Sequence, residues 1–242
     1  MENNSEIFNQ IVEKRKSYRV FDSKNKIPDE VVKRSLERAI LSPNSSNMQL
    51  WEFYIVTKEE DLKTLGSICM NQSGAKTASH MVVFVCRPDK LKHRQQAMVK
   101  NLDNTFKSKD APGAKGAYQY YEQLIPMMYN TSFAFAKDAL KKVFVAYKGL
   151  KKPFVRDVMS KNITIVANKS VALAAQTFML SISAEGYDSL PMEGFDSKRL
   201  KQFLKLPKKA SICMVVSVGE GKPEGLYGPR FRLPYNDVVF EV

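Results

Sequence analysis

The sequence predicts one domain of the α+β class, in which strands and helices are mixed. The chain has 242 residues, of which 44% are hydrophobic and 26% are charged, so it can form a large core. Short apolar runs typical of strands are separated by longer helical patterns of unequal length. This irregular order favours an α+β layered fold over a doubly wound sheet, which would repeat a steady β–α unit.

Helical and strand patterns alternate in the first third of the chain. Periodicity predicts a helix over 6–14 and a second helix over 28–41, which begins at a proline, a residue suited to the first helical turn. Polar turn residues predict a loop over 43–47. Aromatic and β-branched residues predict strands over Trp51–Val56 and His80–Cys86, and the second is apolar enough for a buried strand.

The middle of the chain is dominated by helical patterns. Residues 89–150 mix basic, aromatic and small residues, which predicts helices with an exposed loop near 107–116. The segment 161–185 is rich in Ala, Leu, Val and Met on all sides. This composition predicts a buried central helix, which Gly186 can terminate.

Three further elements are expected near the carboxyl end of the sequence. Asp196 suits the N-cap of a short amphipathic helix that carries Leu200. Residues 211–218 predict a core strand, and residues 237–242 predict a last strand.

The net charge of +13 is concentrated in two segments, residues 137–169 and residues 198–209. We expect solvated helix faces there, although either segment could face an anionic partner. The sequence pI of about 9.5 also allows a nucleic-acid-binding protein as an alternative. No helix-turn-helix, zinc finger or RNP-like strand supports that alternative, so we expect no nucleic-acid partner.

Cysteine usage and hydropathy indicate the compartment. The three cysteines, Cys69, Cys86 and Cys213, are widely spaced and odd in number, so we expect no disulfide framework and a cytoplasmic protein. The longest unbroken apolar run is Met81–Cys86, far below the roughly 20 residues of a membrane span. We therefore expect no membrane association.

Familiar catalytic motifs are absent from the sequence. It contains no G-x-G-x-x-G fingerprint, no P-loop and no G-x-S-x-G elbow. The only histidines, His80 and His93, make a histidine metal site or a Ser-His triad improbable. An enzyme with this sequence would take its reactivity from an organic cofactor.

Two basic clusters suit a phosphate group. Arg15, Ser17 and Arg19 share a face if their segment is extended, and Arg15 and Arg19 do so if it is helical. Arg230 and Arg232 also point the same way in an extended segment. Guanidinium groups match phosphate oxygens in pairs, although each cluster alone could be an ordinary basic turn.

Two other segments suit a planar heterocycle. The loop 43–47 and Gln49 offer amides and hydroxyls that can both donate and accept hydrogen bonds. In 191–195, Gly194 leaves room for a ring to approach the backbone. Each segment alone could equally be a plain turn.

Taken together and in this order, these motifs resemble those of the nitroreductase-like family of FMN-dependent oxidoreductases. The resemblance covers residues 6–86 and 161–242 and is closest to the branch of oxygen-insensitive nitroreductases and dihydropteridine-reductase-like enzymes. The matching motifs are Arg15–Asp22 (RKSYRVFD), Ser42–Trp51 (SPNSSNMQLW), Ala78–Phe84 (ASHMVVF), Pro191–Asp196 (PMEGFD) and Arg230–Pro234 (RFRLP).

The resemblance implies a nitroreductase-like fold over 1–242, with a central, mostly antiparallel sheet flanked by helices and a helical lid over about 87–160. It also implies an intertwined homodimer that exchanges its C-terminal strand, with the site in the interface. A bound FMN would accept hydride at N5 from NADH or NADPH and pass it to a small, flat, electron-poor acceptor such as a nitroaromatic or a quinone. This ping-pong mechanism requires no protein acid or base for the hydride step.

The resemblance also implies a role for individual residues. The FMN phosphate and ribityl chain would be held by Arg15, Lys16, Ser17, Arg19, Arg230 and Arg232. Asn71 would contact the pyrimidine side of the flavin. One face of the ring would be lined by Pro191, Met192, Glu193 and Gly194. A flavin bound mainly to the other subunit would be reached by Pro43, Asn44, Ser45 and Asn47.

Two departures from the family pattern concern the flavin pocket. Leu50 stands where a proline often follows the loop glutamine, and Gly74 stands where a lysine commonly lies near the flavin N1/O2 side. These departures leave the redox potential open. The poorly matching region leaves the acceptor open. A flavoenzyme of the same fold with different chemistry, enoate reduction or reductive dehalogenation, stays an alternative.

Overall fold

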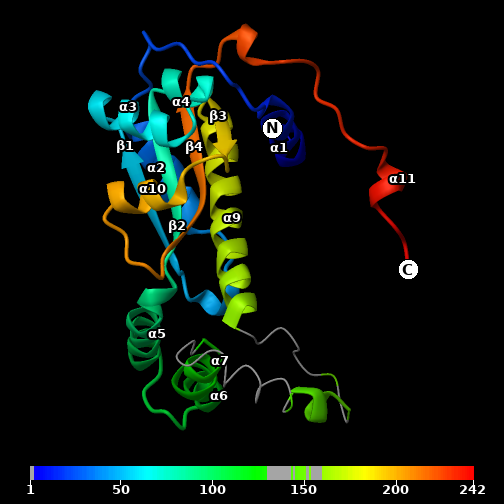
Figure 1. Ribbon diagram of the computed structural model, residues 1–242. Helices are drawn as coiled ribbons and strands as arrows, with labels where there is room; N and C mark the ends of the chain where they lie inside the picture. The colour runs from blue at the N-terminus through cyan, green and yellow to red at the C-terminus, as the bar shows by residue number, and fades with distance from the viewer. Residues whose placement is uncertain (1–2, 130–142, 144, 151–152, 154–159) are drawn as a thin grey trace.

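The computed structural model describes all residues except 1–2, 130–142, 144, 151–152 and 154–159, and a four-stranded antiparallel sheet lies at its centre (Figure 1). The strands are β1 (Trp51–Val56), β2 (His80–Cys86), β3 (Asp188–Met192) and β4 (Ser211–Gly219). Their order in the sheet is β1-β2-β4-β3. The predicted strands β1, β2 and β4 are confirmed.

Strand β3 was not predicted, because its residues look like a turn in the sequence. Pro191 lies within it, opposite Val216 of β4. A proline lacks the N–H that a central strand needs, but β3 is an edge strand and tolerates it. The edge position therefore explains both the strand and its unusual sequence.

Helices cover both faces of the sheet and create two separate cores. On one face α2 (Asp29–Ile40) and α9 (Ser160–Ala184) pack around Phe84. On the other face α3 (Glu59–Ile68), α4 (Ser73–Thr77) and α10 (Ser197–Phe203) pack around Val83. Because both faces are covered, all seven residues of β2 are buried, which explains its continuous apolar sequence.

Helix α9 is the buried central helix that the sequence predicts. Its stretch Ile163–Ala184 has the length and composition of a membrane span, but Val171, Phe178 and Ile182 are fully buried against the sheet. Gly186 follows it with φ of 94°, the left-handed conformation of a helix end. The apolar character of α9 is therefore that of a core helix.

The remaining helices lie around this three-layered body. They include α1 (Asn4–Lys14), η1 (Ser45–Asn47), η2 (Pro88–Lys90), α5 (Leu91–Thr105), α6 (Ala114–Gln119), the π-helical turn η3 (Tyr120–Leu124), α7 (Ile125–Tyr129), η4 (Pro223–Gly225) and α11 (Tyr235–Val238), and residues 145–150 are also helical. The predicted helices of 89–150 are thus confirmed within the described residues. The predicted cap is also present, because the Asp196 carboxylate accepts hydrogen bonds from the backbone N–H groups of Lys198 and Arg199.

The segments that carry the net positive charge, 137–169 and 198–209, differ in how much of each the structure describes. Most basic residues of 198–209 lie on the exposed side of α10 and of the turn after it, which agrees with a solvated face. Much of 137–169 lies outside the described residues.

The predicted strand over 237–242 is wrong for the single chain. Its first two residues belong to the short helix α11, and residues 239–242 pair with no described strand. A strand needs a neighbour for its backbone groups, and this segment runs away from the sheet of its own chain (Figure 1).

The contact between α9 and the sheet predicts the effect of one core substitution. The Phe178 ring is fully buried, with its centroid 5.5 Å from that of Phe84. Phe178→Ala should lower the free energy of unfolding by about 3–5 kcal/mol, because it leaves a cavity in the main core. Denaturant unfolding of this variant should be compared with Leu173→Ala, which alters an exposed position of the same helix. Equal losses for the two would contradict the packing described here.

Candidate functional site

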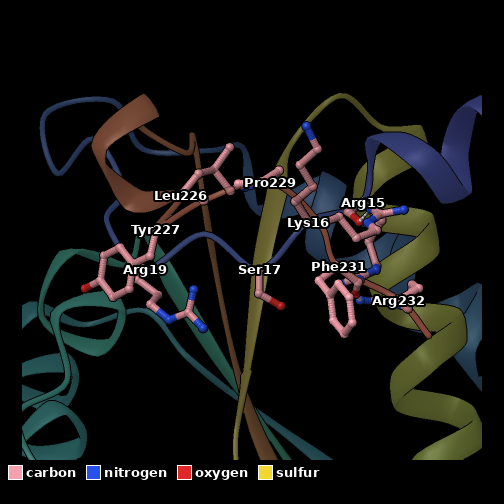
Figure 2. Close-up of a pocket in the computed structure, with 11 residues that line it drawn as sticks. Arg15, Lys16, Ser17, Arg19, Leu226, Tyr227, Pro229, Phe231 and Arg232 are labelled. Atoms are coloured by element: carbon pink, nitrogen blue, oxygen red, sulfur yellow. Dashed lines mark hydrogen bonds between the residues drawn. The ribbon is translucent and has the colours of Figure 1, made fainter.

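Two basic segments from opposite ends of the chain meet at one cavity of about 350 Å³ (Figure 2). The first segment, residues 15–19, follows α1, and the second, residues 226–232, follows η4. We define the basic cradle as the cations and hydroxyl that line this cavity, namely Arg15, Lys16, Ser17, Arg19, Arg230 and Arg232. Among the described lining residues there is no carboxylate, so the cradle suits a compact anion.

The first segment of the cradle is extended, which decides between the two conformations considered from the sequence. Ser17 forms an isolated parallel bridge with Ser189 of β3, and the Tyr18 N–H donates to the Ser189 carbonyl (3.2 Å). The Arg19 N–H donates to the Gly225 carbonyl (3.0 Å). In Figure 2, Ser17 and Arg19 point to one side of the segment and Lys16 points to the other, as extended backbone requires.

Arg230 joins the two segments through the end of α1. Its guanidinium donates to the carbonyls of Val12 (3.3 Å) and Glu13 (2.9 Å), and also to that of Arg15. Carbonyls at a helix C-terminus lack partners within the helix, so a cation stabilises them. Arg230 therefore anchors the second segment, whereas Arg232 makes its only described hydrogen bond to the neighbouring Phe231 carbonyl.

The positive charges of the cradle lie close enough together to shift the pKa of Arg15. Burial lowers the pKa of Arg15, and the charges of Arg230 and Arg232 lower it further. Like charges that are held this close are stabilised when an anion binds between them. The backbone of Ser189 pairs with the first segment, while its side-chain oxygen is buried and has no hydrogen-bond partner within the described residues.

Asn71 lies in a hollow next to the cradle. Arg19 and Tyr227 line both cavities, and the Arg19 guanidinium lies 4.7 Å from the centre of the Tyr227 ring. Asn71 and Gln72 line the second hollow. Tyr227 and Gln72 were missed from the sequence, where only their nearness to Arg230 and Asn71 could have indicated them.

The segment 191–194 approaches the same hollow through Gln72. The Gln72 side-chain amide donates to the Gly194 carbonyl (2.9 Å), and a side chain at Gly194 would begin 3.2 Å from that amide. Pro191 and Glu193 are at least partly exposed, but Met192 is buried in the second core. Only the backbone of Met192 is therefore left to face a ligand.

The fourth predicted segment is not brought to the cradle within one chain. The Ser45 N–H donates to Ser170 Oγ on α9 (3.1 Å), and Asn44 and Asn47 bond within the loop. Roughly 20 Å of helix separate Ser170 from Ala184 at the end of α9 near β3. Pro43, Asn44, Ser45 and Asn47 thus lie at the far end of α9 from the cradle.

Close packing explains the glycine at position 74. A Cβ there would lie 2.4 Å from Leu190 Cδ2 of β3 and 3.6 Å from the Arg19 backbone. A side chain at this position would force the Leu190 side chain to move. Lys76, two residues later, lines a different hollow together with Lys26 and Lys63.

A Ser-His-Asp chain exists in the structure but is not arranged for nucleophilic catalysis. Ser79 Oγ lies 3.0 Å from His80 Nδ1, and His80 Nε2 lies 2.9 Å from Asp29 Oδ1. Ser79 is buried, and its oxygen already accepts the Ile27 N–H (2.9 Å). The His80 hydrogen bond lowers the pKa of Asp29. We interpret this chain as a support for the start of α2.

Comparison of the sequence with known families identifies one match. A sequence model described as the nitroreductase family matches residues 12–220. The chain is also 26% identical over 238 residues to the oxygen-insensitive NAD(P)H nitroreductase of Enterobacter cloacae, and the match covers 94% of this chain and 96% of that relative.

Solved structures show the same fold. The protein ydfN of Bacillus subtilis matches with a TM-score of 0.76 at 19% identity, covering 99% of this chain and 100% of that chain. A protein from Exiguobacterium sibiricum, crystallised in complex with FMN, matches with a TM-score of 0.67 at 24% identity and covers 97% of both chains.

The contact between Gly225 and the first basic segment gives a test of the cradle's architecture. A Cβ at Gly225 would lie 2.7 Å from the Val20 nitrogen and 2.9 Å from its carbonyl oxygen. Gly225→Ala should therefore lower the free energy of unfolding by about 1–3 kcal/mol, because backbone atoms must separate. Gly116→Ala is the matched control, since nothing lies within 4 Å of its Cβ position. Equal unfolding midpoints for the two variants would contradict this packing.

Proposed function

The chain belongs to the nitroreductase family, and on that basis we propose that it is an FMN-dependent oxidoreductase that uses NADH or NADPH. The observation that carries this proposal is the basic cradle, which gathers five cations from both ends of the chain around a cavity of about 350 Å³. A cavity of this size suits the phosphate end of a mononucleotide better than a polynucleotide, which would need an extended basic surface.

The residues present fit FMN at each end of the molecule. Arg15, Ser17, Arg19 and Arg232 would hold the phosphate and the ribityl chain, and Arg230 would keep the second segment against α1. Lys16 points to the other side of its segment and would add only longer-range attraction. Asn71 would meet the pyrimidine side of the flavin, and the backbone of 191–194 would lie along the ring.

Bound FMN would supply the hydride chemistry, taking hydride from the nicotinamide and giving it to the acceptor. The protein's part is to orient the ring and to stabilise negative charge on it. Arg19 is the cation best placed for the second task, because it lies between the cradle and the hollow that contains Asn71. Acceptors are expected to be small, flat and electron-poor, such as nitroaromatics or quinones.

The FMN proposal is tested by titrating the apo-protein with FMN and following flavin fluorescence. Arg232→Ala should raise the dissociation constant about 10-fold to 100-fold, because a charge-assisted hydrogen bond contributes roughly 1.5–3 kcal/mol. Arg199→Ala removes the same type of side chain from the exposed face of α10 and should leave the constant unchanged. The purified protein should also release FMN, rather than FAD, on denaturation.

Absence of FMN binding by the wild-type protein would overturn the proposed function. Equal affinities of the Arg232→Ala and Arg199→Ala variants would instead overturn the placement of the phosphate in the cradle.

A second part of the proposal is that the working form is a homodimer. Residues 227–242 are exposed throughout, and large apolar side chains stand free among them, including Phe231, Tyr235 and Phe240. The face of α1 also exposes Phe8. Apolar surface of this extent marks an interaction site, and a second copy would bring its 43–47 loop to the cradle side of the first.

Deleting residues 233–242 should weaken the dimer while keeping the basic cradle. Each buried large apolar side chain contributes about 1.5–3 kcal/mol, so the dimer dissociation constant should rise at least about 100-fold. Light scattering over a concentration series measures it for the wild type and the truncated chain. A wild-type monomer at micromolar concentration, or an unchanged dissociation constant, would contradict this assembly.

A further inference from the structure

The loop that carries Pro43–Asn47 is held in an unfavourable backbone conformation. Ser46, Asn47 and Gln49 all have positive φ angles, 56°, 49° and 48° respectively. Asparagine adopts this left-handed region readily, but serine and glutamine do so at a cost that neighbouring groups must offset. Within the loop the Gln49 N–H donates to Asn44 Oδ1 (2.8 Å), whereas two of the groups bonded to Ser46 lie outside the loop.

Two groups that hold Ser46 come from the helical region 91–124. Tyr120 Oη and Ser46 Oγ share a hydrogen bond of 2.6 Å, and the Tyr121 hydroxyl donates to the Ser46 carbonyl (3.1 Å). Both tyrosines belong to the π-helical turn η3, and their rings meet edge to face at 5.2 Å. π-Helical turns are rare and are frequent at functional sites. Here the turn brings the hydroxyl groups of Tyr120 and Tyr121 to the same residue, Ser46.

Helix α5 fixes this tyrosine pair and touches the loop itself. The Gln95 side-chain amide donates to the Tyr121 carbonyl (3.0 Å), and the Asn47 amide lies 3.7 Å from the Met98 sulfur. The tyrosine rings also pack against the main core. The helical region and the loop are therefore connected by several independent contacts.

We propose that Tyr120 and Tyr121 are positioning residues that hold the 43–47 loop in its flavin-binding shape and so make flavin affinity depend on the helical region 91–124. This inference rests on the proposed function, because it takes the loop as a flavin contact. The contacts that carry this role are those of the two hydroxyls with Ser46. They act by keeping Ser46 in the left-handed conformation when the loop would otherwise relax.

The test measures FMN dissociation constants of apo-protein variants by fluorescence quenching. Tyr121→Phe and Tyr120→Phe should each raise the constant about fivefold to tenfold, the effect of one lost neutral hydrogen bond. Tyr118→Phe is the matched control, since its hydroxyl donates to Asp103 (2.7 Å) within the same helical region. It should leave the constant within about twofold of the wild type.

A rescue experiment separates positioning from general stability. Glycine adopts positive φ without penalty, so in a chain that carries Ser46→Gly the loop depends less on its restraints. Adding Tyr121→Phe to Ser46→Gly should therefore change the dissociation constant by less than about twofold. A change that merely loosened the helical region would not be rescued by a glycine in the loop.

The outcomes distinguish the inference from the function on which it rests. A wild-type protein without FMN affinity would remove the proposed function. Normal wild-type binding, with Tyr121→Phe and Tyr120→Phe both equal to Tyr118→Phe, would overturn the positioning role alone. An undiminished effect of Tyr121→Phe in the presence of Ser46→Gly would overturn it as well. If one tyrosine variant fails to fold, the other still gives the first comparison.

Discussion

The repulsion of Arg15 by Arg230 and Arg232 in the basic cradle is the constraint on which the rest of this structure depends. Two unit charges 6 Å apart repel by roughly 3 kcal/mol at an effective dielectric of about 20, so a cluster of this kind does not assemble unaided. Nearness in the sequence explains only why Arg15, Lys16 and Arg19 lie together. Arg230 and Arg232 arrive from more than two hundred residues further along the chain, and the fold must supply the energy that keeps them there.

That energy comes from backbone pairing and from the core. The first basic segment hydrogen-bonds on one side to Ser189 and on the other to Gly225, and Phe21 just beyond it is buried in the second core. Glycine makes the close approach possible, since a Cβ at Gly225 would meet the Val20 backbone. Arg230 then donates hydrogen bonds to carbonyls at the C-terminus of α1, where its positive charge is stabilising. The site is thus an extension of the sheet edge, and its geometry is as firm as β3 and β4.

Much of this architecture could be predicted from the sequence, because buried strands and core helices leave strong local patterns. The continuous apolar runs of β2 and α9 were sufficient for both elements. The basic motifs also predicted the cradle, although the sequence could not show which of their arginines face the cavity and which bond to the protein. Whether Arg230 contacts a ligand or caps a helix depends on where α1 ends relative to a segment over two hundred residues away. Strand β3 was missed because only its edge position makes Pro191 acceptable, and α3 and α4 were not foreseen.

The conformation of the loop 43–47 could also not be predicted from its own sequence. Its composition predicts a polar turn, but its left-handed Ser46 is hydrogen-bonded by two tyrosines more than seventy positions later in the chain. The loop lies at the far end of α9 from its own cradle, so in the proposed dimer it would complete the site of the other subunit. A loop that ordered itself only on binding would lose conformational entropy at that moment and weaken the complex. Fixing the loop in advance from within its own chain avoids that loss, and the rigidity of one subunit's helical region then bears directly on the ligand of its partner.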